Sequence, residues 1–268
     1  MSKDHGRRRP PPTRGAPPPR REDGLIELYG THAVEAALAN PARRVARLRV
    51  TENAAHRLAE AIGRRGLTPE PVTPRELDRL LGPDTVHQGA LALVEPLPEP
   101  SLEAVLETVA TGVPLIVLDH VTDPHNVGAV LRSAAVFGAA GLLMTRRHSP
   151  PLNGTLAKSA SGALELVPVL LVQNLAKTLA DLTTRGVATI GLDSSGEGLL
   201  EDCPLTGPLA LVLGAEGKGL RQLTKDSCGV LARIGVGEGG LKSLNVSNAA
   251  AVALHLAAMR RRAIGPRG

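Results

Sequence analysis

The chain has 268 residues, 43% of them hydrophobic, which is enough to build a sizeable core and excludes fibrous, collagen-like and wholly disordered proteins. Tryptophan is absent, and one tyrosine and one phenylalanine are too few for a protein that reads nucleic acid by stacking bases on aromatic side chains. The formal net charge is +5, and most of it lies at the N-terminus.

The first 23 residues differ from the rest of the chain. They hold seven Lys/Arg against three acidic residues, and six prolines in two triplets, with nothing apolar to bury. This composition predicts a disordered basic arm. Such an arm suits a polyanion because it attracts phosphates regardless of sequence, although a purely solubilising tail would have the same composition.

A small α/β unit is expected to follow, over residues 24–95. The pattern predicts helices over residues 32–38, 54–64 and 74–81, and strands over residues 45–50, 70–72 and 90–94. Three prolines then stand at alternate positions, Pro96, Pro98 and Pro100, where they disfavour helix and sheet and favour an extended connection. We therefore expect a linker over residues 96–103 and a second domain over residues 104–268.

The second domain has short apolar runs separated by amphipathic stretches. The expected strands cover residues 115–118, 141–144, 167–172, 187–192, 209–213 and 230–234. Continuous apolar strands interleaved with helices indicate a parallel sheet covered on both faces. An alanine-rich helix over residues 245–262 is suited to close packing, either inside the core or against another subunit.

Polar residues gather after three of these strands, where parallel α/β sheets bind ligands. Asn126 and Arg132 follow the first strand and, taken alone, are consistent with a helix N-cap and a solvated helix charge. Glu216 is the only acid in a glycine loop, residues 214–219, that fits neither a P-loop nor a dinucleotide fingerprint. The last strand precedes four glycines within six residues and then Ser243, Asn245 and Ser247 at alternate positions.

Together the three segments resemble the three motifs of the SpoU (TrmH-type) family of SPOUT methyltransferases. The matching positions are Asn126, Gly128 and Arg132 in the first motif, Leu213, Gly214, Glu216 and Gly219 in the second, and residues 243–247 in the third. The start of the small unit at Tyr29 and Gly30 is similar to the L30e-like substrate-binding domain of these enzymes. The subgroup that methylates a guanosine of 23S ribosomal RNA is the one that the chain looks most like, on residues 158–163 with Glu165, Val167 and Pro168, and on residues 214–223 with Thr224.

The resemblance implies S-adenosylmethionine-dependent 2'-O-methylation of an RNA ribose by a homodimer whose active sites draw on both subunits. It implies a SPOUT-type parallel-sheet domain with a C-terminal trefoil knot. Arg132 would be catalytic, acting on the 2'-hydroxyl directly or through the neighbouring phosphate. Asn126, Glu216, Ser243 and Asn245 would orient Arg132 and the ribose. The cofactor-binding residues would be Leu213, Gly214, Gly219, Ile234, Leu244 and Ser247.

Alternatives stay open at this point. Transfer RNA or another ribosomal RNA ribose could be the substrate. Residues 234–240 lack the proline that the family usually has there, which motivates a second hypothesis, a catalytically silent RNA-binding or ribosome-assembly factor.

We expect neither a metal nor a membrane. Methyl transfer from a sulfonium needs no metal, and His120 and His125 have no third ligand spaced to join them. No apolar run reaches the roughly 18 residues of a membrane span. Two cysteines, Cys203 and Cys228, are too few for a disulfide framework, so we expect a cytoplasmic protein.

Overall fold

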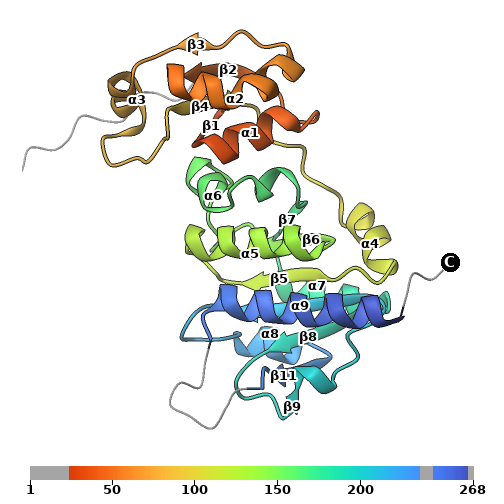
Figure 1. Ribbon diagram of the computed structural model, residues 1–268. Helices are drawn as coiled ribbons and strands as arrows, with labels where there is room; N and C mark the ends of the chain where they lie inside the picture. The colour runs from red at the N-terminus through yellow and green to blue at the C-terminus, as the bar shows by residue number, and fades with distance from the viewer. Residues whose placement is uncertain (1–23, 236–243, 265–268) are drawn as a thin grey trace, which may run out of the picture.

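The computed structural model describes residues 24–235 and 244–264, arranged as two α/β units (Figure 1). The N-terminal unit contains β1 (Ile26–Tyr29), α1 (Thr31–Ala39), β2 (Val45–Val50), α2 (Glu52–Arg65), β3 (Glu70–Pro71), α3 (Pro74–Leu81) and β4 (Ala90–Val94). Its sheet has the order β1-β4-β2-β3, with β4 antiparallel to β1 and β2, and β3 parallel to β2. The helices and strands expected between residues 32 and 94 are confirmed, and β1 is an edge strand that the sequence did not indicate.

Local caps set the boundaries of α2 and the start of α3 in this unit. The hydroxyl of Thr51 accepts a hydrogen bond from the amide of Ala54 at the start of α2, and Gly66 ends that helix with a φ of 68°. Thr73 and Glu76 form a reciprocal capping box at the start of α3. These are local interactions between close neighbours, which is why the pattern located both helices to within two residues.

The C-terminal unit is a parallel sheet with helices between its strands. Its elements are α4 (Leu102–Ala110), β5 (Leu115–Asp119), α5 (Pro124–Phe137), β6 (Gly141–Thr145), α6 (Gly154–Ser159), η1 (Ala163–Glu165), β7 (Val169–Val172), α7 (Leu175–Thr184), β8 (Ala188–Leu192), β9 (Gly198–Leu199), η2 (Leu200–Asp202), β10 (Leu209–Gly214), α8 (Gln222–Asp226), β11 (Val230–Arg233) and α9 (Val246–Ile264). Within the described residues the sheet has seven strands in the order β7-β6-β5-β10-β8-β11-β9, and every pair is parallel. The predicted parallel sheet and its strands are confirmed.

Both faces of this sheet are covered. Ile116 and Leu118 of β5 belong to a core cluster that includes residues of α5 and α9, whereas Leu115 and Val117 belong to a second cluster with residues of α4 and α7. Side chains alternate between the faces of a strand, so one strand supplies both cores. The helices α5 and α9 pack against each other on one face (Figure 1).

Two local expectations differ from the structure. Helix α4 begins at Leu102, inside the range expected for the linker, because the hydroxyl of Ser101 accepts a hydrogen bond from the amide of Ala104. Asn126 is not an N-cap. Asp123 caps α5 instead, by accepting a hydrogen bond from the amide of His125, and this leaves the side chain of Asn126 free to contact other segments.

The buried face of α5 provides a test of this arrangement. Leu131 of α5 has no exposed surface, so Leu131→Ala is expected to lower the free energy of unfolding by about 2–5 kcal/mol. Leu223→Ala is the matched control, because 63% of that side chain is exposed and its loss should cost no more than about 0.5 kcal/mol. Urea unfolding of both variants measures the difference. Equal losses would contradict the packing of α5.

Candidate functional site

The three motif segments meet at the carboxyl edge of the parallel sheet. Strands β5 and β10 are neighbours, and their register places Asp119 beside Gly214. The chain leaving β5 starts α5, and the chain leaving β10 forms the glycine loop. Asn126, Glu216 and Asn245 therefore come together although up to 119 residues separate them.

These three side chains form a closed group of hydrogen bonds. Asn245 Nδ2 donates to Asn126 Oδ1 at 2.9 Å, and Asn126 Nδ2 donates to Glu216 Oε2 at 3.4 Å. Asn245 Nδ2 also lies 3.4 Å from Glu216 Oε2. The carboxylate thus receives two amide donors, and within the described residues no cation pairs with it.

The start of α9 fixes the orientation of Asn245. Its Oδ1 accepts hydrogen bonds from the amide of Ser247 at 2.9 Å and from the hydroxyl of Ser247 at 2.6 Å. The oxygen of the amide is therefore occupied by helix capping, and Nδ2 is left to face Asn126 and Glu216. Capping and site geometry are two roles of one side chain.

The glycine loop after β10 is folded tightly on itself. Gly219 donates its backbone N–H to the carbonyl of Ala215 at 2.9 Å. A Cβ on Gly214 would lie 2.1 Å from the carbonyl carbon of Gly219 and 2.3 Å from the amide nitrogen of Leu220. All of these neighbours are backbone atoms that cannot rotate away, so position 214 requires glycine.

Two carboxylates hold the end of this loop, one from each strand beside β10. Asp119, fully buried at the end of β5, accepts hydrogen bonds from the backbone N–H and the Nε of Arg221 at 3.1 and 2.7 Å. Asp193, directly after β8, lies 3.0 Å from Lys225 Nζ and accepts from the amide of Leu220 at 3.4 Å. Burial favours a raised pKa for Asp193, but the hydrogen bonds from Ser195 and Lys225 outweigh it, and the pKa lies below the ordinary value.

The sequence interpretation did not single out Asp119 or Asp193 as part of the site. A signal was present, since each is an acid that directly follows an apolar strand at the edge where ligands bind. An ionised group there needs a partner, and a loop leaving the neighbouring strand can supply one.

Arg132 does not join the hydrogen-bonded group. It lies on α5 six residues after Asn126, about 9 Å farther along the helix axis, and its side chain is exposed. In the part of the chain that the structure describes, no hydrogen bond or ion pair involves its guanidinium.

The expected cofactor-binding residues lie along the same edge. Leu213 and Gly214 are buried at the end of β10, and Gly219 closes the loop. Ile234 directly follows β11, and Leu244 is exposed just before α9. Ser243 and most of the loop 235–240 lie outside the described residues.

The two histidines near the first motif have other neighbours. The ring of His120 stacks on that of His148 with centroids 4.4 Å apart, and His125 Nδ1 lies 3.2 Å from the hydroxyl of Ser159. Over residues 24–235 and 244–264, no group of three His, Cys, Asp or Glu side chains is placed to hold a metal ion. The same residues include no helix of the length and apolarity that crossing a membrane requires.

Comparisons with known proteins agree with this geometry. Residues 114–255 match the SpoU rRNA Methylase family, and residues 28–100 match the RNA 2'-O ribose methyltransferase substrate binding family. Two proteins described as 23S rRNA (guanosine-2'-O-)-methyltransferase RlmB are each 41% identical to this chain. The one from Ralstonia nicotianae covers 89% of this chain and 97% of its own length, and the one from Pseudomonas aeruginosa covers 85% and 94%.

A solved structure has the same fold. The SpoU methyltransferase AviRb from Streptomyces viridochromogenes, in complex with AdoMet, aligns with a TM-score of 0.74 at 23% identity, over 91% of this chain and 92% of that one. The fold and the three meeting segments define a parallel-sheet α/β protein of the methyltransferase type. The chain belongs to the SpoU methylase family, as the sequence resemblance predicted.

The close contact at Gly214 provides the next prediction. We expect Gly214→Ala to displace the glycine loop and to lower the free energy of unfolding by about 1–3 kcal/mol, because the added methyl group meets rigid backbone. Gly63→Ala in α2 is the control, since nothing lies within 4 Å of its added Cβ and the change should be neutral or stabilise by up to about 1 kcal/mol. Urea unfolding compares the two, and equal effects would contradict the loop geometry.

Proposed function

We propose that this protein transfers a methyl group from S-adenosylmethionine to the ribose 2'-hydroxyl of a guanosine in 23S ribosomal RNA. Membership of the SpoU methylase family and the names of the 41% identical relatives support this activity. The observation that carries it to particular residues is the hydrogen-bonded group of Asn126, Glu216 and Asn245, which unites one side chain from each motif.

The backbone at the carboxyl edge fits a cofactor with several polar atoms. Gly217 in the glycine loop has open space beside it, because an added Cβ would meet nothing within 4 Å, and Leu213, Gly214 and Gly219 would offer their main-chain polar groups next to it. Ile234, Leu244 and Ser247 would complete the binding residues from the segments beside it. When bound, S-adenosylmethionine supplies a methyl group on a positively charged sulfur.

Arg132 is the proposed catalytic residue. Its guanidinium is permanently charged and offers a planar fork of donors, so it is suited to holding an RNA phosphate and to stabilising negative charge on the 2'-oxygen, rather than to removing a proton. Asn126, Glu216 and Asn245, with Ser243, would orient the ribose beside it. The fixed amide of Asn245 means that this orientation exists before RNA binds.

We assign domain roles as follows. Residues 24–95 form the L30e-like domain that binds substrate, residues 96–103 connect it, and residues 104–268 form the catalytic domain. Residues 1–23, a basic arm by composition, add attraction for RNA phosphates. A trefoil knot at the C-terminus and action in the cytoplasm belong to the same proposal.

The protein is further proposed to act as a homodimer. Exposed apolar side chains support this, because Val136 on α5 and Val252 and Met259 on the adjacent α9 are 76%, 42% and 52% exposed in the single chain. Such a group of apolar residues on two packed helices is suited to an interface. Arg132 precedes Val136 by one helical turn, so a partner there would lie close to the catalytic residue.

The role of Arg132 is tested with unmodified 23S ribosomal RNA and labelled S-adenosylmethionine. Arg132→Ala is expected to reduce methyl transfer by at least about 100-fold, because the charge that stabilises the reacting oxygen is lost, while the unfolding curve is unchanged. Arg185→Ala, which removes a largely exposed arginine directly after α7 that pairs with Asp181, should retain activity within about twofold. Full activity of Arg132→Ala would refute its role.

Mapping the methylated nucleotide tests the substrate. A mark on a guanosine of 23S ribosomal RNA is expected, and a mark on transfer RNA or on another ribose would refute that part of the proposal. Binding of 23S ribosomal RNA by the wild-type protein without any methyl transfer would favour the silent assembly factor.

A further inference from the structure

Residues 154–165, which we call the seating segment, lie between the two units of the protein. The segment contains α6 and η1, and it includes residues 158–163 and Glu165, which are among those that resemble the guanosine-specific subgroup. None of these residues belongs to the proposed catalytic or cofactor-binding set. In Figure 1 it occupies the space between the N-terminal sheet and helix α5.

Apolar side chains of the seating segment join the cores of the two units. Leu156, Ala160 and Leu164 are buried, and they belong to one core cluster with Leu28 of β1 and Leu131 of α5. The N-terminal unit is therefore not connected to the C-terminal unit by the linker alone. Its core continues through the seating segment to the helix that carries the first motif.

Two glycines allow this segment to approach backbone on both sides. A Cβ on Gly154 would lie 2.0 Å from the carbonyl oxygen of Glu27 in β1. On the other side, a Cβ on Gly128 of α5 would lie 2.5 Å from the Cβ of Ser159. The glycine of the first motif thus serves the packing of the seating segment, and α6 is held within van der Waals contact of both units.

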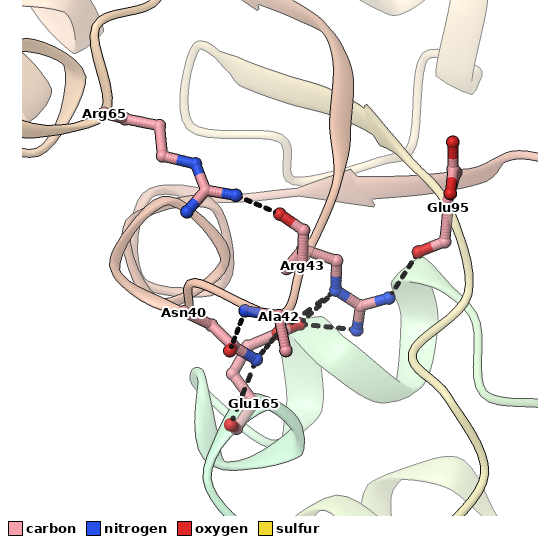
Figure 2. A network of polar contacts seen from close by, with 6 residues as sticks. All are labelled: Asn40, Ala42, Arg43, Arg65, Glu95 and Glu165. Atoms are coloured by element: carbon pink, nitrogen blue, oxygen red, sulfur yellow. Dashed lines mark hydrogen bonds and ion pairs between the residues drawn. The ribbon is translucent and has the colours of Figure 1, made fainter.

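A buried ion pair crosses the same boundary (Figure 2). Arg43, in the N-terminal unit, lies 2.7 Å from Glu165 Oε1, and the two side chains are 3% and 2% exposed. Arg43 Nε donates to the same carboxylate at 3.1 Å, and Asn40 Nδ2 donates to Glu165 Oε2 at 2.9 Å. Arg43 Nη1 donates to the carbonyl of Glu95 at 2.7 Å, and Arg65 donates to the carbonyl of Arg43.

A buried ion pair of this kind affects the relative orientation of the two units more than it affects the free energy of unfolding. The desolvation free energy of two buried charges is about as large as the electrostatic attraction between them. An apolar contact of the same size would therefore stabilise the boundary between the units equally well. However, the carboxylate of Glu165 accepts donors from Arg43 and Asn40 together, and any rotation of one unit against the other would leave a buried charge without a partner. Only one orientation satisfies all of these groups.

We infer that the seating segment fixes the substrate-binding unit over helix α5, and that the Arg43–Glu165 pair thereby determines which RNA the protein selects. This inference rests on the proposed function. A rigid arrangement holds the RNA-contacting surface of one unit at a set distance and angle from the site on the other. An RNA whose shape matches both surfaces gains both contacts, whereas an unrelated RNA gains one.

Glu165→Gln is the decisive variant. It keeps the shape of the side chain but leaves Arg43 charged and buried without a carboxylate, so the orientation of the units is no longer unique. If the competent orientation falls to one-tenth of the population, the affinity for an unmodified 23S ribosomal RNA transcript falls about tenfold. Affinity for an unrelated RNA of the same length, and for S-adenosylmethionine, should stay within about twofold.

The matched control is Asp181→Asn, which removes a carboxylate from the exposed pair between Asp181 and Arg185. It should change none of these affinities by more than about twofold, because an exposed pair is worth little. Hydrogen exchange without RNA gives an independent readout. Amides of the seating segment should exchange faster in Glu165→Gln than in the wild type, and should be unchanged in Asp181→Asn.

Each result has a defined meaning. Unchanged exchange in the seating segment, or unchanged selectivity between the two RNAs, overturns the inference. A parallel loss of affinity for S-adenosylmethionine also overturns it, since the damage would then be general. If Glu165→Gln does not fold, Asn40→Ala replaces it, because that variant removes one donor to Glu165 and keeps the ion pair, and the same reduced selectivity is expected to a smaller degree.

The readouts separate this inference from the proposed function. RNA binding and hydrogen exchange require no methyl transfer, so they can be measured even on a protein without catalytic activity. Absence of methyl transfer by the wild type would refute the proposed function alone. Loss of activity in Glu165→Gln with unaltered selectivity would refute the inference alone.

Discussion

The pairing of β5 with β10 is the constraint on which the site depends. These strands lie in the middle of the sheet, are parallel, and end at the same edge with Asp119 beside Gly214. The pairing sets where α5 starts and where the glycine loop turns, and so it brings Asn126 to Glu216. Asn245 reaches them because α9 packs on α5 and begins at the same edge.

Much of this could be predicted from the sequence, because its signals are local. Apolar runs located most of the strands, the amphipathic pattern located α2 and α3, and the parallel sheet followed from strands buried on both faces. The meeting of Asn126, Glu216 and Asn245 was anticipated only through the family motifs, because spacing alone does not tell which distant loops share an edge.

The remainder depended on contacts between distant residues. A glycine at position 128 or 214 looks the same in a sequence whether it provides a turn, room for a ligand or room for backbone, and the structure shows that backbone fills both places. Arg43 and Glu165 are ordinary charged residues in the sequence and would be placed on the surface by composition rules. Their burial arises from a boundary between units that no local pattern encodes.

The exposure of Arg132 has an electrostatic consequence. A charge in bulk water interacts weakly with another 4 Å away, by about 1 kcal/mol, whereas the same pair near a protein surface interacts by about 4 kcal/mol. A guanidinium that water surrounds therefore stabilises a developing negative charge poorly. In our proposal an RNA phosphate and a second subunit lie close to Arg132, and both would raise the effectiveness of its charge by excluding water. The orientation of the substrate-binding unit and the catalytic step are therefore physically linked. An RNA bound in the wrong position does not exclude water from the guanidinium, and the hydrated guanidinium then stabilises the negative charge on the reacting oxygen only weakly.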